Sequence, residues 1–208
     1  MSGMQGVLPV GLDVSRETSG RLQGYLDLVA KWNPHINLVA PGTLADGWNR
    51  HIADSLQLWG LGALPSGRWL DLGSGGGFPG MVIAILAQEL APGLKVTLVD
   101  SDVRKCVFLR EVARSLHLSV EVVTVRIEAM PPAGADVVSA RALAPLTDLI
   151  GFARRHMKPE GRALFLKGRN HQEELEVARK NWDFDCEAFP SQTDREAVIL
   201  SIRNIRHG

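Results

Sequence analysis

A short apolar strand runs directly into a glycine-rich turn at residues 69–80, and this stretch limits the fold more than any other. Glycines stand at positions 73, 75 and 77. Because glycine has no Cβ atom, it tolerates positive φ and lets the backbone approach a ligand closely. Pro79 suits the first turn of a following helix, and a helix N-terminus beside such a loop favours an anionic or oxygen-rich group. The stretch therefore predicts a nucleotide-type site between a strand and a helix.

The spacing of the glycines separates classes of nucleotide site. A dinucleotide-binding loop reads G-x-G-x-x-G, with a third glycine for close helix packing, whereas position 78 here is Phe. The pattern G-x-G-x-G, with Asp71 two residues before it, resembles motif I of the Rossmann-like S-adenosylmethionine methyltransferases. That cofactor has no pyrophosphate, so its amino-acid end needs backbone contacts, and the Asp71 carboxylate can hold its ammonium group. A glycine-rich turn without a ligand is the alternative.

A second acidic residue ends the next predicted strand. Residues 95–100 read as a strand that finishes at Asp100, about the interval at which such folds place a carboxylate on ribose hydroxyls. Alternatively, Asp100 caps the helix that follows.

Composition excludes several classes of protein. The 208 residues suffice for one α/β domain with a modest extension, and no apolar run approaches the roughly 20 residues of a membrane span. Residues 1–10 lack the features of a secretion signal. The two cysteines fit a reducing cytoplasm, and neither they nor the six histidines have metal-ligand spacing, so we assign no metal. A net charge of zero argues against a DNA-coating protein, although residues 139–171 hold a local basic excess.

Hydrophobic periodicity predicts the order of elements. Residues 14–32 read as a helix with Pro34 just beyond its end, and residues 44–59 as another helix or a broken helix pair. Helices and strands then alternate, which argues for a parallel sheet with helices on both faces. The expected elements are helix 79–90, strand 95–100, helix 102–117, strands 120–125 and 136–140, helix 145–157, strand 162–167, helix 171–181, and closing strands 182–189 and 197–205. We predict a single domain over 1–208, with 12–60 as an N-terminal helical extension.

Several short motifs resemble one family more narrowly. They are Asn37-Leu38, Arg50-His51-Ile52-Ala53-Asp54-Ser55-Leu56, the loop ending Phe78-Pro79-Gly80, Asp100-Ser101, Phe108-Leu109, Ser139-Ala140-Arg141-Ala142 and Lys167-Gly168. Together, from about residue 20 to 205, they resemble the bacterial small-subunit (16S) ribosomal RNA guanine-N7 methyltransferases, the glucose-inhibited division protein B family. Arg104-Lys105 departs from the Lys-Arg that the family often shows. The resemblance implies an α/β, Rossmann-like class I S-adenosylmethionine-dependent methyltransferase: a mainly parallel sheet with a C-terminal antiparallel hairpin and an N-terminal helical cap.

The resemblance also implies site residues. Beside Asp71, Gly75 and Asp100, the cofactor site takes Gly73, Phe78, Ile127, Glu128 and Arg141. The catalytic candidates are Arg141, Arg126 and Lys167. Arg126 and Lys167, together with Arg169, would offer charge to RNA phosphates or guanine O6. Guanine N7 loses no proton on methylation, so positioning rather than a general base is required. The alternatives are a solvated carboxylate for Glu128, an ion pair for Arg141 and solvated surface residues for the others. Arg50 and His51 face the site, or His51 is a core histidine.

The expected function is methyl transfer from S-adenosylmethionine to small-subunit ribosomal RNA or the 30S subunit, by a cytoplasmic monomer without a membrane partner. A small-molecule methyltransferase on the same fold is the first alternative. A nicotinamide-dependent oxidoreductase is disfavoured by Phe78. The third alternative is a protein that binds a nucleotide without turnover.

Overall fold

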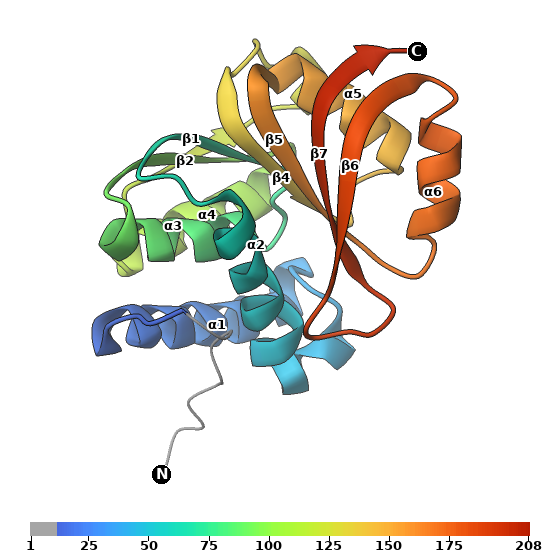
Figure 1. The fold of residues 1–208 in the computed structure, drawn as a ribbon. Coiled ribbons are helices and arrows are strands. Elements are labelled where there is room, and N and C mark those ends of the chain that lie inside the picture. Colours follow the sequence, from blue (N-terminus) through green and yellow to red (C-terminus); the bar gives the residue numbers. More distant parts are fainter. Residues whose placement is uncertain (1–11) are drawn as a thin grey trace.

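A seven-stranded sheet forms the centre of the protein, seen in a computed structural model that describes residues 12–208 (Figure 1). The strands lie in the order β3 (Val120–Thr124), β2 (Gly93–Asp100), β1 (Ser66–Leu72), β4 (Ala135–Arg141), β5 (Met157–Lys167), β7 (Val198–His207) and β6 (Trp182–Pro190). The first five are parallel, and β7 is antiparallel to both β5 and β6. The predicted parallel sheet with an antiparallel closing hairpin is therefore confirmed. The expectation about a secretion signal in residues 1–10 lies outside the described residues.

The two faces of the sheet bury separate cores because side chains alternate along each strand. On β1, Trp69 belongs to the core beneath α3 (Gly80–Leu90) and α4 (Val103–Ser115). Its neighbours Leu70 and Leu72 belong to the core beneath α5 (Leu146–His156). The last helix, α6 (His171–Ala178), precedes the hairpin. Helices thus cover both faces, as the alternating pattern predicts.

The N-terminal helices are part of the first core. Helix α1 (Arg16–Ile36) and α2 (Asp54–Gly62) pack against α3, whose first eight residues are all buried. A helix that is apolar all round needs cover on every side, and α1 and α2 supply it on the side away from the sheet. Between them lie the short 3-10 helix η1 (Pro41–Asp46) and the π-helix η2 (Trp48–Ala53), so the broken alternative for residues 44–59 is confirmed.

Two predicted boundaries are wrong by four residues or more, and α6 ends at Ala178, three residues before the predicted end. Pro34 lies inside α1 rather than beyond it, because a proline removes only one hydrogen bond so near a helix end, and Asn37 closes the helix at φ +46° with its N–H on the Asn33 carbonyl. Strand β5 begins at Met157 rather than near residue 162, with an irregular register opposite Ala135 and Val137. Neither difference alters the carboxyl edge of the sheet.

Candidate active site

A cavity of about 680 Å³ opens at the carboxyl ends of β1, β2, β3 and β4, the edge where open α/β sheets bind ligands. Eight of the sequence-predicted residues line it: Gly73, Gly75, Phe78, Asp100, Arg126, Ile127, Glu128 and Arg141. The remaining two, Asp71 and Lys167, do not. The sequence therefore located this cavity but did not fix the direction of every side chain.

The glycine loop between β1 and α3 has the conformation that the sequence predicts. Gly73, Gly75 and Gly77 have φ angles of +60°, +57° and +98°. A Cβ atom on Gly77 would lie 2.6 Å from the Tyr25 hydroxyl, whereas one on Gly75 would meet nothing closer than the Gly73 carbonyl at 3.8 Å. Gly77 is therefore required by packing, while Gly75 leaves open space beside the cavity.

Tyr25 of α1 holds this loop from the N-terminal side. Its hydroxyl donates a 2.6 Å hydrogen bond to the Gly76 carbonyl, and the Tyr25 and Phe78 ring centroids are 4.9 Å apart. Tyr25 is fully buried. The N-terminal extension thus supports the cavity wall directly.

Asp100 fixes the same loop from the end of β2. Its Oδ2 accepts a 2.7 Å hydrogen bond from the Gly75 N–H, and its Oδ1 accepts one of 2.8 Å from the Asp102 N–H. The N-cap of α4 is Asp102, which accepts from the Arg104 N–H, so the capping alternative for Asp100 is wrong. Each carboxylate oxygen of Asp100 can still accept a further bond, which leaves it available to a ribose hydroxyl at the cavity.

Asp71 lies beneath the loop rather than in the cavity. Strand alternation turns its side chain towards α3, where it is fully buried and accepts a 2.6 Å hydrogen bond from the Ser139 hydroxyl. Burial raises the pKa of Asp71 to about 6, against the hydrogen bonds that lower it. The expected direct contact of this carboxylate with a ligand ammonium group does not fit this geometry, and Asp71 instead braces β1 against β4.

Arg141 closes the opposite wall through three contacts. Its guanidinium lies 4.9 Å from the Phe78 ring centroid, and its Nη1 donates to the Arg50 carbonyl at 3.2 Å and meets His51 Nδ1 at 3.0 Å. The alternative that Arg141 serves in a direct structural ion pair has no support among residues 12–208, where none of the salt bridges includes it. Its remaining nitrogens make no hydrogen bond with the described residues and can donate to a ligand.

His51 lines the cavity and is also buried, so the two interpretations from the sequence, a site residue and a core histidine, each describe it in part. Thr43 Oγ1 donates to the Ala40 carbonyl and therefore accepts from His51 Nε2–H at 2.8 Å, which leaves Nδ1 as an acceptor for Arg141. Burial, with the nearby Arg141 and Arg50 charges, lowers the pKa of His51 to about 4. The imidazole is consequently neutral near pH 7 and orients Arg141.

Lys167 lies in a second cavity that adjoins the first. Its ammonium group is 2.6 Å from a Glu174 carboxylate oxygen, and the second cavity also includes Arg141 and His51. The basic stretch 139–171 does not form one face. Lys158 pairs with Asp136 at the amino end of β5, and Arg162, in the middle of this strand, bonds the Leu61 carbonyl, whereas Lys167 lies at the carboxyl end. The role predicted for Lys167 remains a prediction.

Sequence reasoning missed several lining residues. They are Thr43, Lys105, Asp148 and Phe152, together with the apolar residues Leu38 and Leu143. Lys105 and Asp148 lie in the first turns of α4 and α5, and helices that follow strand ends place their first turn at this edge. That rule could have found these two residues. Thr43 depends on the fold of η1 and carries no such signal.

The lining suits a nucleoside with a charged tail. Open space at Gly75, the Asp100 carboxylate and the apolar side chains of Val125, Ile127 and Phe152 provide a backbone cradle, a hydroxyl acceptor and a surface for a base. S-adenosylmethionine fits this set of groups. Among residues 12–208, no cluster of three metal-ligating side chains occurs, and no helix is long and apolar enough to cross a membrane.

Comparison with known proteins agrees with this geometry. A family model described as rRNA small subunit methyltransferase G (GidB) matches residues 18–197. The ribosomal RNA small subunit methyltransferase G of Cereibacter sphaeroides is 55% identical over 196 residues, which cover 94% of each chain. The protein of the same name from Parvibaculum lavamentivorans is 53% identical over 94% of this chain and 87% of its own.

Among solved structures, a TehB-like SAM-dependent methyltransferase from Corynebacterium glutamicum superposes with a TM-score of 0.59. It is 16% identical over 87% of this chain and 98% of its own, a likeness that concerns the fold. The class I methyltransferase fold predicted from the glycine loop is confirmed.

Proposed function

The chain belongs to the rRNA small subunit methyltransferase G family, and on that premise we propose that it transfers a methyl group from S-adenosylmethionine to N7 of a guanine in small-subunit (16S) ribosomal RNA. The observation that carries the proposal is the family match across residues 18–197, which includes the glycine loop, Asp100 and Arg141 around one cavity. A nicotinamide-dependent oxidoreductase would not belong to this family. A protein that binds a nucleotide without turnover would lack the methyltransferase activity for which the family is named.

When bound, S-adenosylmethionine would supply an electrophilic methyl group, and its sulfur would keep both electrons of the bond that breaks. The N7 lone pair forms the new bond and the guanine gains the positive charge, so no proton has to be removed. The protein therefore has to align the reactants and exclude water, and such positioning can supply roughly 7 to 11 kcal/mol of the barrier. None of the residues around the cavity has to act as a general base.

The proposed roles follow from where each side chain lies. Gly73 and Gly75 would present backbone to the methionine end, Asp100 would accept from the ribose, and Ile127 and Glu128, which line the same cavity, would contact the adenine edge. Asp71 acts through the loop that it supports.

The catalytic candidates differ in their surroundings. Arg141 lines both cavities, Arg126 is exposed at the rim of the first, and Lys167 lies in the second. Arg141 can offer charge to guanine O6, while Arg126 and Lys167 can offer it to phosphates. We propose that these three residues meet the RNA.

The substrate is proposed to be a folded part of the small-subunit RNA, alone or in the 30S subunit. The major groove of A-form RNA is too deep and narrow for a protein to reach guanine N7, so the target guanine lies in a loop, a bulge or an extruded position. We further propose that the chain acts as a monomer in the cytoplasm. Its single methyltransferase domain includes residues 12–60 as a helical extension, which agrees with the core shared by α1 and α3.

Transfer of a labelled methyl group tests the proposal directly. The purified protein is incubated with radiolabelled S-adenosylmethionine and, in parallel, with 30S subunits, protein-free 16S RNA, 50S subunits or a small-metabolite extract. The expected result is label in 30S subunits or in protein-free 16S RNA, recovered as 7-methylguanosine after digestion. Label only in the metabolites would favour the small-molecule alternative. Binding of the cofactor without transfer to any acceptor would favour a binding protein.

A further inference from the structure

A second cavity, of about 320 Å³, adjoins the first at the end of β4. The two share four lining residues: Thr43, His51, Arg141 and Ala142. Its volume lies near the lower limit of small-ligand sites, which suits part of a substrate rather than a whole cofactor. A part of the substrate in the second cavity would therefore lie next to the first cavity, with the Arg141 side chain between the two.

Charged side chains of both signs line this second cavity, and most of them are paired. Lys167 contacts Glu174 at 2.6 Å, and Arg50 contacts Asp194 at 2.9 Å. Asp54 and Arg141 are the exceptions, since no salt bridge within residues 12–208 includes either of them. Among the described residues, Asp54 is thus the one carboxylate of this cavity without a salt bridge, although the Arg141 and Arg50 charges act on it from farther away.

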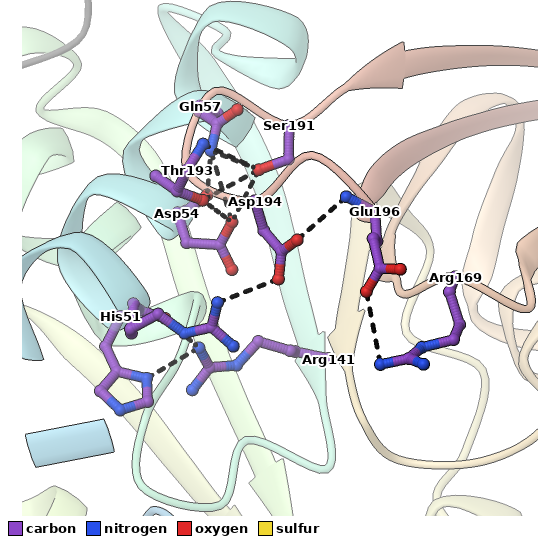
Figure 2. Close-up of polar contacts among 10 residues, drawn as sticks. His51, Asp54, Gln57, Arg141, Arg169, Ser191, Thr193, Asp194 and Glu196 are labelled. Carbon is purple, nitrogen blue, oxygen red and sulfur yellow. Dashed lines mark hydrogen bonds and ion pairs between the residues drawn. The ribbon is translucent and has the colours of Figure 1, made fainter. Parts of the chain in front are cut away.

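The hydrogen bonds of Asp54 all go to one of its oxygens. Oδ1 accepts from Thr193 Oγ1 at 2.9 Å and more distantly from Ser191 and Gln57, while Oδ2 accepts none from the described residues. Figure 2 shows the second oxygen without a dashed line, on the side of Asp54 away from Thr193. Thr193 therefore orients the carboxylate and leaves Oδ2 available to a ligand.

A loop of the C-terminal hairpin completes the wall. Residues 191–197 connect β6 to β7, and the Gln192 N–H donates to Gln57 Oε1 at 2.8 Å, while Asp194 forms a salt bridge with Arg50 of η2. Asp54 follows η2 directly, so both segments that frame it are tied together. The position of Asp54 is thereby fixed by groups far apart in the sequence.

We propose that the second cavity receives the extruded target guanine, whose N1–H and 2-amino group donate to the Asp54 carboxylate. This inference rests on the proposed function. Guanine alone among the four RNA bases presents two adjacent donors on its Watson–Crick edge, and base-modifying enzymes read an extruded base on that edge. With N1–H and the 2-amino group at Asp54, O6 lies beside N1 and N7 lies beyond O6, on the side that would face Arg141 and the first cavity. Asp54 is then the residue that selects guanine.

The test compares guanosine with inosine, which lacks the 2-amino group, at the methylated position of a ligated RNA or reconstituted subunit. Wild-type protein is expected to methylate the inosine substrate with kcat/KM at least about tenfold lower, because a hydrogen bond to a charged group is lost. Asp54→Asn removes the charge and replaces one acceptor oxygen with an NH2 donor. Its kcat/KM on guanosine is expected to fall by a similar factor, and its preference for guanosine over inosine should be small. S-adenosylmethionine affinity, measured by calorimetry, should not change.

Two control variants separate base selection from structure. Thr193→Val removes the hydrogen bond to Asp54 but leaves the carboxylate, and should keep a preference for guanosine. Asp27→Asn makes the same chemical change on the exposed side of α1 and should behave as wild type.

Equal wild-type kcat/KM values on guanosine and inosine would overturn the inference. Because this comparison uses only the wild-type protein, it tests the inference even if Asp54→Asn does not fold. A folded Asp54→Asn variant that retains the wild-type preference would overturn it too. No transfer to guanosine by the wild type would instead reject the proposed function.

Discussion

At the scale of single residues, two glycines with almost the same φ angle allow loss of ligand binding to be distinguished from backbone strain. Gly75 has φ +57° beside the cavity, and Gly134 has φ +59° in the loop before β4, and a Cβ atom meets no close contact at either position. Valine at either site should cost about 1–3 kcal/mol of stability from backbone strain. Only Gly75→Val should abolish S-adenosylmethionine binding in calorimetry, because only that side chain enters the cavity. Normal binding by Gly75→Val would place the cofactor elsewhere.

The lowered pKa of His51 predicts a pH dependence of stability. The unfolded chain takes up a proton at an ordinary histidine pKa near 6.5, whereas the folded protein does so only near pH 4. The contribution of neutral His51 is therefore fully present above pH 6.5 and declines as the pH falls through this window. Its total is about 3 kcal/mol by the usual conversion.

Denaturant unfolding of wild type and His51→Gln at several pH values measures this contribution. The difference between their free energies of unfolding should be largest at pH 7 and should shrink steadily towards pH 4. A difference that stays constant across the range would mean that His51 titrates equally in both states.

At the scale of elements, α1 and the glycine loop meet through one hydrogen bond. Tyr25→Phe keeps the ring against Phe78 but leaves the buried Gly76 carbonyl without the Tyr25 hydroxyl. Such an unsatisfied acceptor costs about 1–3 kcal/mol, and the loosened loop should bind S-adenosylmethionine several-fold more weakly. Urea unfolding and calorimetry measure the two effects. Unchanged cofactor affinity at reduced stability would limit Tyr25 to packing.

Element types and order were predictable because periodicity reports which face of each segment is buried. Residues 81–87 form an apolar run that covers the whole helix surface, so the cover by α1 and α2 was implicit in the sequence. The helix end at Ile36 was not predictable from Pro34, since the Asn37 conformation and the Asn33 side-chain bond to the Val39 N–H hold that end.

The candidate site was predictable where it depends on strand ends and glycines, and less so elsewhere. Gly75 and Asp100 follow from the order of strands and loop. The contact between His51 and Arg141 joins residues 90 positions apart, and the sequence alone does not show which side-chain atoms meet. The direction of Asp71 follows from alternation with Leu70 and Leu72, a signal present in the sequence but outweighed by the resemblance of motif I.

At the scale of the whole molecule, three distant parts of the chain meet at one edge of the sheet. The N-terminal helices supply His51, the end of β4 supplies Arg141, and the hairpin loop supplies Asp194, so two adjoining cavities form where none of these segments would suffice alone. The proposed site thus draws on the N-terminal helices, the parallel sheet and the C-terminal hairpin together.

Methylation of guanine N7 by the site at the carboxyl edge of the sheet would leave a modified nucleotide that can be located in small-subunit ribosomal RNA. A 7-methylguanosine carries positive charge, and after borohydride reduction its position in the RNA is cleaved by aniline. Small-subunit RNA from cells with the intact gene should show one cleavage, in an irregular loop, that is missing after deletion of the gene and is not restored by the Gly75→Val variant. Cleavage at that position that persists in the deletion strain would contradict the account.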